Sequence, residues 1–439
     1  MIMTSPVTKQ SFLSKILATI SRHLKTKGSF GRNVTLLVGG TALGQIIRVV
    51  ATPVLTRLYT PEEFGILASF IAILGILSGA AGLRYELAIP LPEKERDAIA
   101  LVLLALAISM VLSIAASIFT WFAGSRFLEW AGLSSLVPYM WLLPIGMVLT
   151  TSYQIFNFWA IRHRAYGAIA RTKMSQAIGN VLTQGVAGSL SLGPIGLIVG
   201  NLVGRGLGTV TLARGFMKSL NQAKAINLFE AARRFIRFPK YSSVATTINI
   251  AGVQAPVLLI TAYFGPEAAG WFLLSQRIMG LPMSLIGQSA GQVFTGEAAT
   301  LARVDPARFY QMFLRVSSHL FIIGCPVLLL VGLIAPLFFG KIFGSGWEMS
   351  GNVTLVLTPM YIAQFTISPV SQTLSILERQ DLQLYSDIIR LFVGVGSIWL
   401  TGGILGLSAL YSIGIYGLAM MGAYLLLGYM SLIVMRRVN

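Results

Sequence analysis

Residues 59–65 read Tyr-Thr-Pro-Glu-Glu-Phe-Gly, and residues 263–270 read Tyr-Phe-Gly-Pro-Glu-Ala-Ala-Gly. Both stretches contain Pro-Glu-x-x-Gly, at an offset of 205 residues that is close to half of the 439-residue chain. Proline suits the first turn of a helix, and glutamate at that position complements the helix dipole. Each stretch follows one long apolar segment and precedes another. We therefore interpret the chain as a duplication that produces two parallel repeats of six helices each.

The composition indicates an integral membrane protein. Hydrophobic residues make up 55% of the chain, charged residues only 11%, and the mean hydropathy is +0.75. A soluble globular protein would carry about 25% charged residues. Apolar runs of about 20 residues are long enough to cross a bilayer as helices, and they are continuous rather than alternating, which excludes a transmembrane β-barrel. The fold class that we predict is therefore an all-α integral membrane protein.

Twelve membrane-spanning helices account for the apolar runs. The distribution of Lys and Arg supports this number, because 25 of the 33 fall in segments on one side of the predicted membrane, including Arg162 to Lys173. The opposite side holds only Arg57, Arg126 and Lys341. The positive-inside rule then places both termini in the cytoplasm. The predicted spans are residues 33–57, 64–90, 98–122, 136–161, 167–191, 194–215, 241–264, 267–296, 310–338, 352–377, 382–404 and 408–435.

The spans divide the chain into four parts. Residues 32–215 form the first six-helix lobe and residues 241–439 the second. Residues 216–240 are a basic linker with apolar residues on one helical face, which predicts an amphipathic helix on the cytoplasmic leaflet. Residues 1–31 are basic with apolar residues at helical spacing, so either an amphipathic surface helix or a disordered basic tail fits them.

Five arginines remain inside the predicted spans, and they are the main functional clue. A cationic side chain in the hydrocarbon region costs about 2.5–3.5 kcal/mol even on a lenient scale, so it must face a partner, a bundle interior or a water-filled cavity. Only two acidic residues, Glu86 and Asp387, lie near these depths. Several unpaired cations inside a bundle predict a cavity that receives an anion. The five are Arg48, Arg84, Arg205, Arg277 and Arg390.

Structural roles compete with anion binding for three of these arginines. Arg84 can pair with Glu86, and Arg390 can pair with Asp387 one helical turn away. Arg205 lies in a glycine-rich stretch that is typical of close helix packing. A structural role, with its hydrogen bonds satisfied by neighbouring residues, is as well supported for it as a place in the cavity lining. Arg48 and Arg277 are therefore the strongest candidates for lining the cavity.

Aromatic and amide side chains on the spans have similar alternatives. Six of the seven tryptophans fall near the predicted outer ends of spans, where an interfacial belt is the usual role and stacking on sugar rings the functional one. Amides can bind sugar hydroxyls, although interhelical hydrogen bonding is their more common use. The amides in question are Gln45, Asn180, Asn249, Gln254, Gln288 and Gln292.

Several motifs resemble those of bacterial polysaccharide-biosynthesis flippases, a family of the multidrug/oligosaccharidyl-lipid/polysaccharide exporter superfamily. The resemblance covers roughly residues 33–437. It rests on Leu55-Thr-Arg-Leu-Tyr-Thr-Pro-Glu-Glu-Phe-Gly65, Arg84-Tyr-Glu-Leu-Ala-Ile-Pro90, Phe238-Pro-Lys-Tyr-Ser242, Gly270-Trp-Phe-Leu-Leu-Ser-Gln-Arg-Ile-Met-Gly-Leu-Pro282 and Gly287-Gln-Ser-Ala-Gly-Gln-Val-Phe294. It implies two six-helix lobes in a V around a central cavity, working by alternating access.

The resemblance also implies a function. Such proteins are expected to move an undecaprenyl-diphosphate-linked oligosaccharide from the cytoplasmic to the periplasmic leaflet for O-antigen, capsule or exopolysaccharide biosynthesis. The implied location is the bacterial inner membrane. The implied partners are this lipid-linked substrate, membrane lipids, and the polysaccharide polymerase with its chain-length machinery. Neither nucleic acid nor a cofactor is expected, and the lone Cys325 and three scattered histidines imply no metal site.

Two other classes of protein remain as alternatives. A multidrug or cation exporter of the same superfamily would favour buried carboxylates over arginines. A membrane enzyme that modifies or polymerises polysaccharide would need a catalytic carboxylate, a histidine or a large periplasmic loop, and every predicted outer loop is short. We therefore expect a transporter rather than an enzyme. No glycine-rich phosphate loop suggests ATP coupling, whereas Asp387 and Glu86 are candidates for coupling to protons or sodium.

Overall fold

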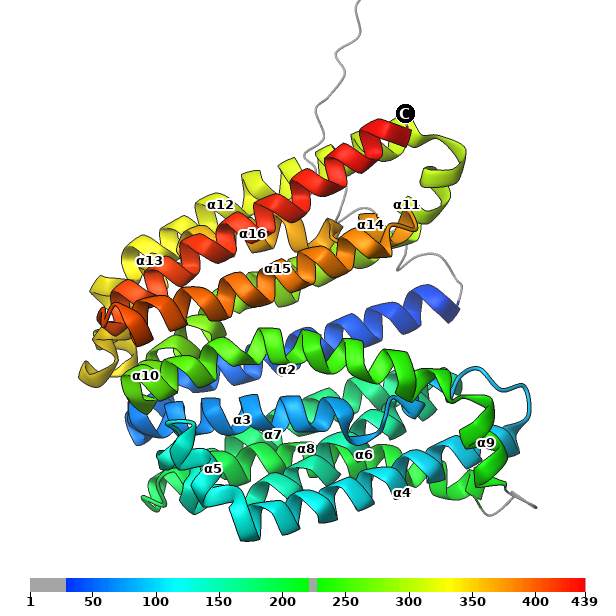
Figure 1. Ribbon diagram of the computed structural model, residues 1–439, viewed down its shortest axis with the longest axis horizontal. Coiled ribbons are helices and arrows are strands. Elements are labelled where there is room, and N and C mark those ends of the chain that lie inside the picture. Colours follow the sequence, from blue (N-terminus) through cyan, green and yellow to red (C-terminus); the bar gives the residue numbers. More distant parts are fainter. Residues whose placement is uncertain (1–28, 221–226, 439) are drawn as a thin grey trace, which may run out of the picture.

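The computed structural model describes residues 29–220 and 227–438, and all regular elements in this part of the chain are helices (Figure 1). Most of the predicted amphipathic segment at residues 1–31 and part of the predicted linker at residues 216–240 lie outside the described residues. Each of the twelve predicted spans corresponds to one long helical segment. The all-α fold expected from the apolar runs is confirmed.

The first bundle contains six long helices. Short elements connect them at both ends, among them α5 (Ser125–Trp130), η1 (Tyr85–Ala88) and η3 (Ser134–Tyr139). Thr60 begins the second helix with a capping box, because its side chain accepts from the Glu63 amide while Glu63 accepts from the Thr60 amide. The six helices are α2 (Ser29–Leu58), α3 (Pro61–Ala81), α4 (Glu95–Phe119), α6 (Leu142–Arg162), α7 (Tyr166–Ser189) and α8 (Pro194–Leu220).

The second bundle repeats this arrangement. Its first long element, α10 (Val244–Pro282), contains two helices that meet at Gly265, whose φ of 84° is accessible to glycine and breaks the helical path. The second of them continues through η5 (Met283–Gly287) into α11 (Gln288–Val304). The remaining helices are α12 (Pro306–Phe343), α13 (Glu348–Ile367), α15 (Gln380–Ile398) and α16 (Ala409–Val438), with the short α14 (Thr373–Ile376) before α15.

The second span ends earlier than predicted. Helix α3 stops at Ala81, and Leu83 and Arg84 follow with φ of 45° and 59°. These left-handed conformations are unfavourable for side chains other than glycine and cannot continue an α-helix. The chain then forms η1 rather than extending a helix to residue 90. This break turns Arg84 and Glu86 away from the path of α3.

The two Pro-Glu-x-x-Gly turns pack directly against each other. A Cβ atom added to Gly65 would overlap the Pro266 carbonyl oxygen, and one added to Gly270 would overlap the Pro61 carbonyl oxygen. The contact is reciprocal, so each repeat places its glycine against the proline of the other. Glycine is required here because two backbones approach more closely than any side chain permits. The duplicated sequence motif is therefore the point at which the two bundles meet.

Further contacts between the bundles surround this point. The Trp347 indole donates a hydrogen bond to the Thr56 carbonyl at 2.9 Å and stacks edge-on against Phe64 at a centroid distance of 5.0 Å. The hydroxyls of Ser69 and Thr261 lie 2.6 Å apart in the same seam. In Figure 1 the bundles lie together at this end and diverge toward the end that carries α9 (Leu228–Arg234), α11 and α14.

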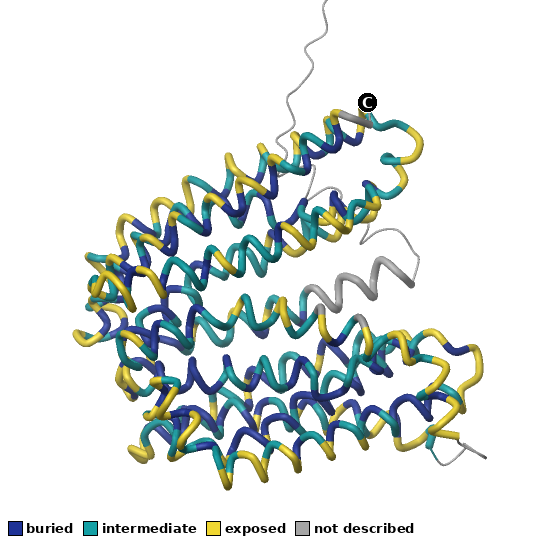
Figure 2. Tube along the Cα trace, in the orientation of Figure 1, coloured by how far each residue is buried: buried dark blue, intermediate teal, exposed yellow. Residues whose placement is uncertain are grey.

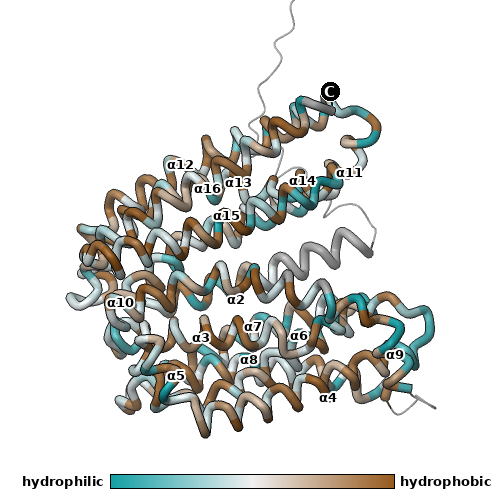
Figure 3. The backbone as a smooth tube through the Cα atoms, viewed as in Figure 1, coloured by the Kyte–Doolittle hydropathy of each residue, from teal (hydrophilic) through white to brown (hydrophobic). Residues whose placement is uncertain are grey.

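The surface is suited to a bilayer. Eight helical stretches of the described residues are long and apolar enough to cross a membrane, and one of them, Thr246–Val304, is the broken α10 together with α11. Buried residues face the bundle interiors, whereas many exposed positions on the outward faces are apolar (Figures 2 and 3). Trp121 and Trp130, each 84% exposed, lie at the end where the bundles meet. This arrangement is the one expected of a multi-pass membrane protein.

Candidate functional site

Three of the five predicted arginines lie at one depth. Arg48 on α2, Arg205 on α8 and Arg277 on α10 are each ten or eleven residues from the closed end of their helix. At 1.5 Å per residue this is about 15 Å, or half of the hydrocarbon thickness. Arg48 is close enough to Arg205 and Arg277 for their like charges to interact. The structure therefore brings together the two strongest candidates and one of the weaker ones.

Lys173 is a fourth cation of this group, and the sequence reasoning missed it. The positive-inside count assigns it to the cytoplasmic segment Arg162 to Lys173, although it falls inside the predicted span 167–191. The structure places it on α7, two turns from the start of the helix, where its charge interacts with those of Arg48 and Arg205. Its ammonium lies 5.0 Å from the centroid of the Tyr153 ring. We call Arg48, Lys173, Arg205 and Arg277 the cationic cluster.

The partners of the cationic cluster are neutral. Arg205 donates to Asn201 Oδ1 at 3.0 Å and to Thr150 Oγ1 at 3.1 Å. Arg277 donates to Thr52 Oγ1 at 3.4 Å, and its guanidinium lies 5.4 Å from the centroid of the Phe64 ring. Among the described residues, none of the four cations makes a salt bridge to a carboxylate.

Arg48 is the least satisfied member of the cluster. Its Nε is buried and has no hydrogen-bond partner in the described part of the protein. A buried donor on a charged group without a partner costs free energy, and such a group in a native protein usually marks a site for a ligand, ion or water. The cluster as a whole thus carries four positive charges that the surrounding protein does not neutralise. Its chemistry is suited to an anion with several acceptor oxygens.

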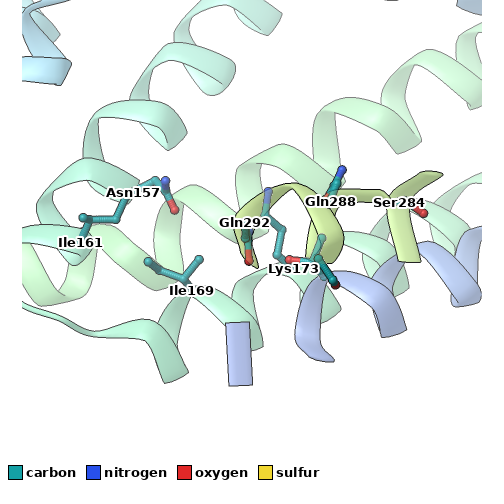
Figure 4. Close-up of a pocket in the computed structure, with 9 residues that line it drawn as sticks. Asn157, Ile161, Ile169, Lys173, Ser284, Gln288 and Gln292 are labelled. Atoms are coloured by element: carbon teal, nitrogen blue, oxygen red, sulfur yellow. The ribbon is translucent and has the colours of Figure 1, made fainter. Parts of the chain in front are cut away.

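A polar pocket extends from Lys173 between the two bundles (Figure 4). It encloses about 180 Å³. Helices α2, α6 and α7 line it from the first bundle, and η5 and α11 line it from the second. The lining residues are Thr41, Asn157, Ile161, Ile169, Lys173, Ser284, Gln288, Ser289 and Gln292. Its side chains are mostly amides and hydroxyls, without a carboxylate.

The other two predicted arginines have acidic partners away from the cluster. Arg84 donates to Glu86 Oε1 at 3.1 Å and, through Nε and Nη2, to Thr246 Oγ1 at 3.3 and 3.2 Å. Arg390 on α15 donates to Asp387 at 3.0 Å. These are the two pairings that the sequence offered as structural alternatives. Both arginines are thereby neutralised, so their prediction as anion-binding residues has little support from their surroundings.

We expect the substitution Arg84→Ala to destabilise the protein by about 3 kcal/mol. The Glu86 side chain is only 2% exposed, and removing its partner leaves a buried carboxylate unpaired. The double variant Arg84→Ala/Glu86→Gln removes the orphaned charge and should recover part of the loss. Thermal unfolding of the purified protein in detergent measures both. A double variant that is no more stable than Arg84→Ala would contradict this explanation.

The described residues contain no group of three or more His, Cys, Asp and Glu side chains that could hold a metal ion. Cys325 lies on α12, partly buried, with a free thiol. Glu86 and Asp387, the two residues predicted for ion coupling, are each paired with a single arginine.

Comparisons with known proteins agree with this architecture. A family model described as polysaccharide biosynthesis protein matches residues 54–351, more than half of the chain. No curated protein sequence matches significantly. Among solved structures, the chain resembles an inward-facing multidrug resistance MATE family transporter of the MOP superfamily, with 14% identity, a TM-score of 0.72, and coverage of 90% of this chain and 94% of that one.

Two further structures share the fold. The lipid II flippase MurJ in an inward closed conformation has 13% identity and a TM-score of 0.65, with 91% of this chain and 86% of that chain covered. An outward-facing multidrug resistance MATE family transporter has 13% identity and a TM-score of 0.53, with 92% and 98% covered. These likenesses confirm the fold that was expected from the sequence.

Proposed function

This chain belongs to the polysaccharide biosynthesis protein family, and from this membership we propose that it is a flippase for a lipid-linked oligosaccharide. The substrate is an oligosaccharide joined through a diphosphate to undecaprenol. The protein moves it from the cytoplasmic to the periplasmic leaflet, for assembly of O-antigen, capsule or exopolysaccharide. The same fold occurs in multidrug transporters and in a lipid II flippase, so the choice between them depends on the site.

The cationic cluster is the observation that carries the proposal. A diphosphate is an anion with several acceptor oxygens, and arginine offers it permanently charged, bidentate hydrogen bonds. Four cations without a salt bridge at the middle of the bundle have a cost that an anionic substrate offsets. The polyprenyl chain would remain in the bilayer while the diphosphate contacts Arg48, Lys173, Arg205 and Arg277.

The arrangement of the bundles supports alternating access with the substrate entering from one side. They are in contact at the Pro61–Gly270 and Gly65–Pro266 seam and diverge toward the end that carries α9 (Figure 1). The basic loops predict that the diverging end faces the cytoplasm, with both termini on that side of the bacterial inner membrane. In this state, a lipid-linked sugar on the cytoplasmic leaflet would reach the cluster from between the bundles.

The coupling and the partners of transport are further parts of the proposal. Glu86 and Asp387 are the described carboxylates at membrane depth that we propose for proton or sodium coupling, each acting through its arginine partner. The polysaccharide polymerase and its chain-length machinery are the proposed recipients of the exported repeat unit. The linker helix α9 carries exposed Phe229 together with Arg233 and Arg234, and exposed Ile236 follows it in a turn, as expected of a segment that contacts lipid headgroups.

A multidrug or cation exporter is the second candidate, because its fold is the same. An organic cation would require carboxylates at the site, whereas Glu86 and Asp387 are already neutralised by arginines and the cluster itself is positive. The charge of the site therefore favours an anionic substrate. The solved structures that share the fold are transporters and a flippase rather than enzymes.

Deletion of the gene in its host tests the proposal. We expect the null strain to lose surface polysaccharide and to accumulate lipid-linked repeat units that remain accessible only from the cytoplasmic leaflet. Mass spectrometry of extracted lipids measures the accumulation, and the wild-type gene supplied from a plasmid should reverse it. A null strain with normal surface polysaccharide and an increased sensitivity to cationic drugs would instead identify a multidrug exporter.

A further inference from the structure

The polar pocket beside Lys173 has the composition of a sugar-binding site. With a volume of about 180 Å³, the pocket has room for one sugar ring. Asn157, Gln288 and Gln292 contribute amides, and Ser284 contributes a hydroxyl. Amides and hydroxyls both donate and accept hydrogen bonds, as sugar hydroxyls do.

The amides of this pocket are not used by the protein itself. Gln288 and Gln292 are exposed, and within the described residues their side chains make no hydrogen bond. Ser284, Gln288 and Gln292 follow one another at intervals of four residues through η5 and α11, so they share one helical face. The interhelical hydrogen bonds that are the usual role of such amides are therefore absent here.

Asn157 presents an unmet acceptor on the opposite wall. Its Oδ1 is buried and has no partner in the part of the protein described. Buried polar atoms of native proteins nearly always have a partner, which can be a ligand or an ordered water. Asn157 comes from α6 of the first bundle, whereas Gln288 and Gln292 come from α11 of the second. A ligand in the pocket would therefore hydrogen-bond to both bundles at once.

Lys173 connects this pocket with the cationic cluster. It lines the pocket and also interacts with Arg48 and Arg205. Figure 4 shows its side chain beside those of Gln288 and Gln292. A substrate whose diphosphate contacts the cluster would thus extend its next group into the pocket. In a lipid-linked oligosaccharide, that group is the sugar attached directly to the diphosphate.

We propose that this pocket binds the first sugar of the substrate, with Asn157, Gln288 and Gln292 as the residues that recognise its hydroxyl or acetamido groups. The inference rests on the proposed function and makes it more specific, because it assigns selection of the substrate to one sugar. It also gives that sugar a role in transport. A sugar held by both bundles favours the arrangement in which they lie close together around it.

Soluble analogues of the substrate test the inference in the purified protein. The probes are citronellyl diphosphate alone and citronellyl diphosphate that carries glucose, galactose, N-acetylglucosamine or N-acetylgalactosamine. We expect at least one sugar-bearing probe to bind about tenfold more tightly than the bare diphosphate, the effect of two or three hydrogen bonds. The double variant Gln288→Ala/Gln292→Ala should remove this difference and leave the affinity for bare diphosphate unchanged.

Control variants and the remaining outcomes separate the two proposals. Gln311→Ala, an exposed glutamine on α12, should bind all probes as the wild type does. If no probe binds to the wild type, the flippase proposal itself fails. If the bare diphosphate binds and no sugar increases its affinity, or if the double variant keeps the full difference, the sugar pocket is wrong while the cationic site stands. Unchanged affinity for bare diphosphate shows that the double variant is folded.

Discussion

Replacing Arg48 with alanine is expected to reduce export of the lipid-linked oligosaccharide by roughly 10- to 100-fold while the protein remains folded in the membrane. A charge-assisted hydrogen bond contributes about 1.5–3 kcal/mol, and 1.4 kcal/mol corresponds to a factor of ten. Arg48 is the member of the cluster whose loss is simplest to interpret. Its Nε has no hydrogen-bond partner in the protein, so removing this donor leaves no buried acceptor without a hydrogen bond.

Arg277→Ala should also reduce export, but for two separate reasons. Its guanidinium donates to Thr52 and lies over Phe64, the ring that stacks on Trp347. Removing it therefore weakens the contacts between the bundles as well as the anion site. A comparison of the two variants separates these effects, because only Arg277→Ala should change the closed end.

Transport of a fluorescent lipid-linked oligosaccharide in proteoliposomes, together with surface polysaccharide in complemented null cells, measures the loss. Arg48→Lys should retain part of the activity, because lysine keeps the charge and loses the bidentate geometry. The matched control is Arg126→Ala, which removes an exposed arginine on α5, a helix that contributes no residue to the cluster. Normal surface polysaccharide in both the Arg48→Ala and Arg277→Ala strains would rule out the anion site.

The sequence was sufficient to predict which residues could form the site, but not which of them do. Every arginine inside a span carries the same energetic cost, so hydropathy alone ranks Arg84 beside Arg48. The difference lies in backbone geometry: left-handed residues after α3 turn Arg84 toward Glu86 and Thr246. No periodicity signals such a break. Local spacing did identify the alternatives, since Glu86 and Asp387 are two and three residues from their arginines.

Two other residues show the limits of span assignment. The positive-inside count assigns Lys173 to the cytoplasmic segment Arg162 to Lys173, whereas the structure places it inside α7 and in the cationic cluster. Trp347 lies near a predicted outer end, as a belt residue should, yet it is 2% exposed and joins the bundles. Trp121 and Trp130, at equivalent depth, are largely exposed. The sequence predicts how deep in the membrane a tryptophan lies. Whether its side chain faces the lipid or the other bundle depends on tertiary packing.

Substituting the glycines of the duplicated motif should have a second large effect, on the conformation of the protein, because Gly65 and Gly270 permit the two bundles to meet. We expect Gly65→Ala and Gly270→Ala each to shift the population away from the present arrangement, in which the bundles touch at this seam, by roughly 5- to 150-fold. In both cases the new methyl group would overlap a carbonyl oxygen of the other bundle, Pro266 or Pro61. Overpacking of this kind costs about 1–3 kcal/mol, and backbone atoms cannot swing aside as a flexible side chain can.

The protein supplies a matched control in the same helical segment. Gly280 has no atom within 4 Å of an added Cβ, so Gly280→Ala should be neutral or stabilise the helix by up to about 1 kcal/mol. If Gly270→Ala and Gly280→Ala behaved alike, helix propensity rather than the seam would explain the result. Gly65→Ala/Gly270→Ala should cost less than the sum of the single variants, since one displacement of the seam relieves both overlaps.

Distances between spin labels at Lys94 and Ala307, both exposed at the diverging end, report the state directly in a Cys325→Ser background. In the wild type we expect the distance distribution to be dominated by the separation in the present structure. In Gly65→Ala and Gly270→Ala that population should fall and a shorter distance should appear, because opening the seam brings the opposite ends of the bundles together. Unchanged distributions in both variants would mean that the bundles do not pivot about the Pro-Glu-x-x-Gly turns.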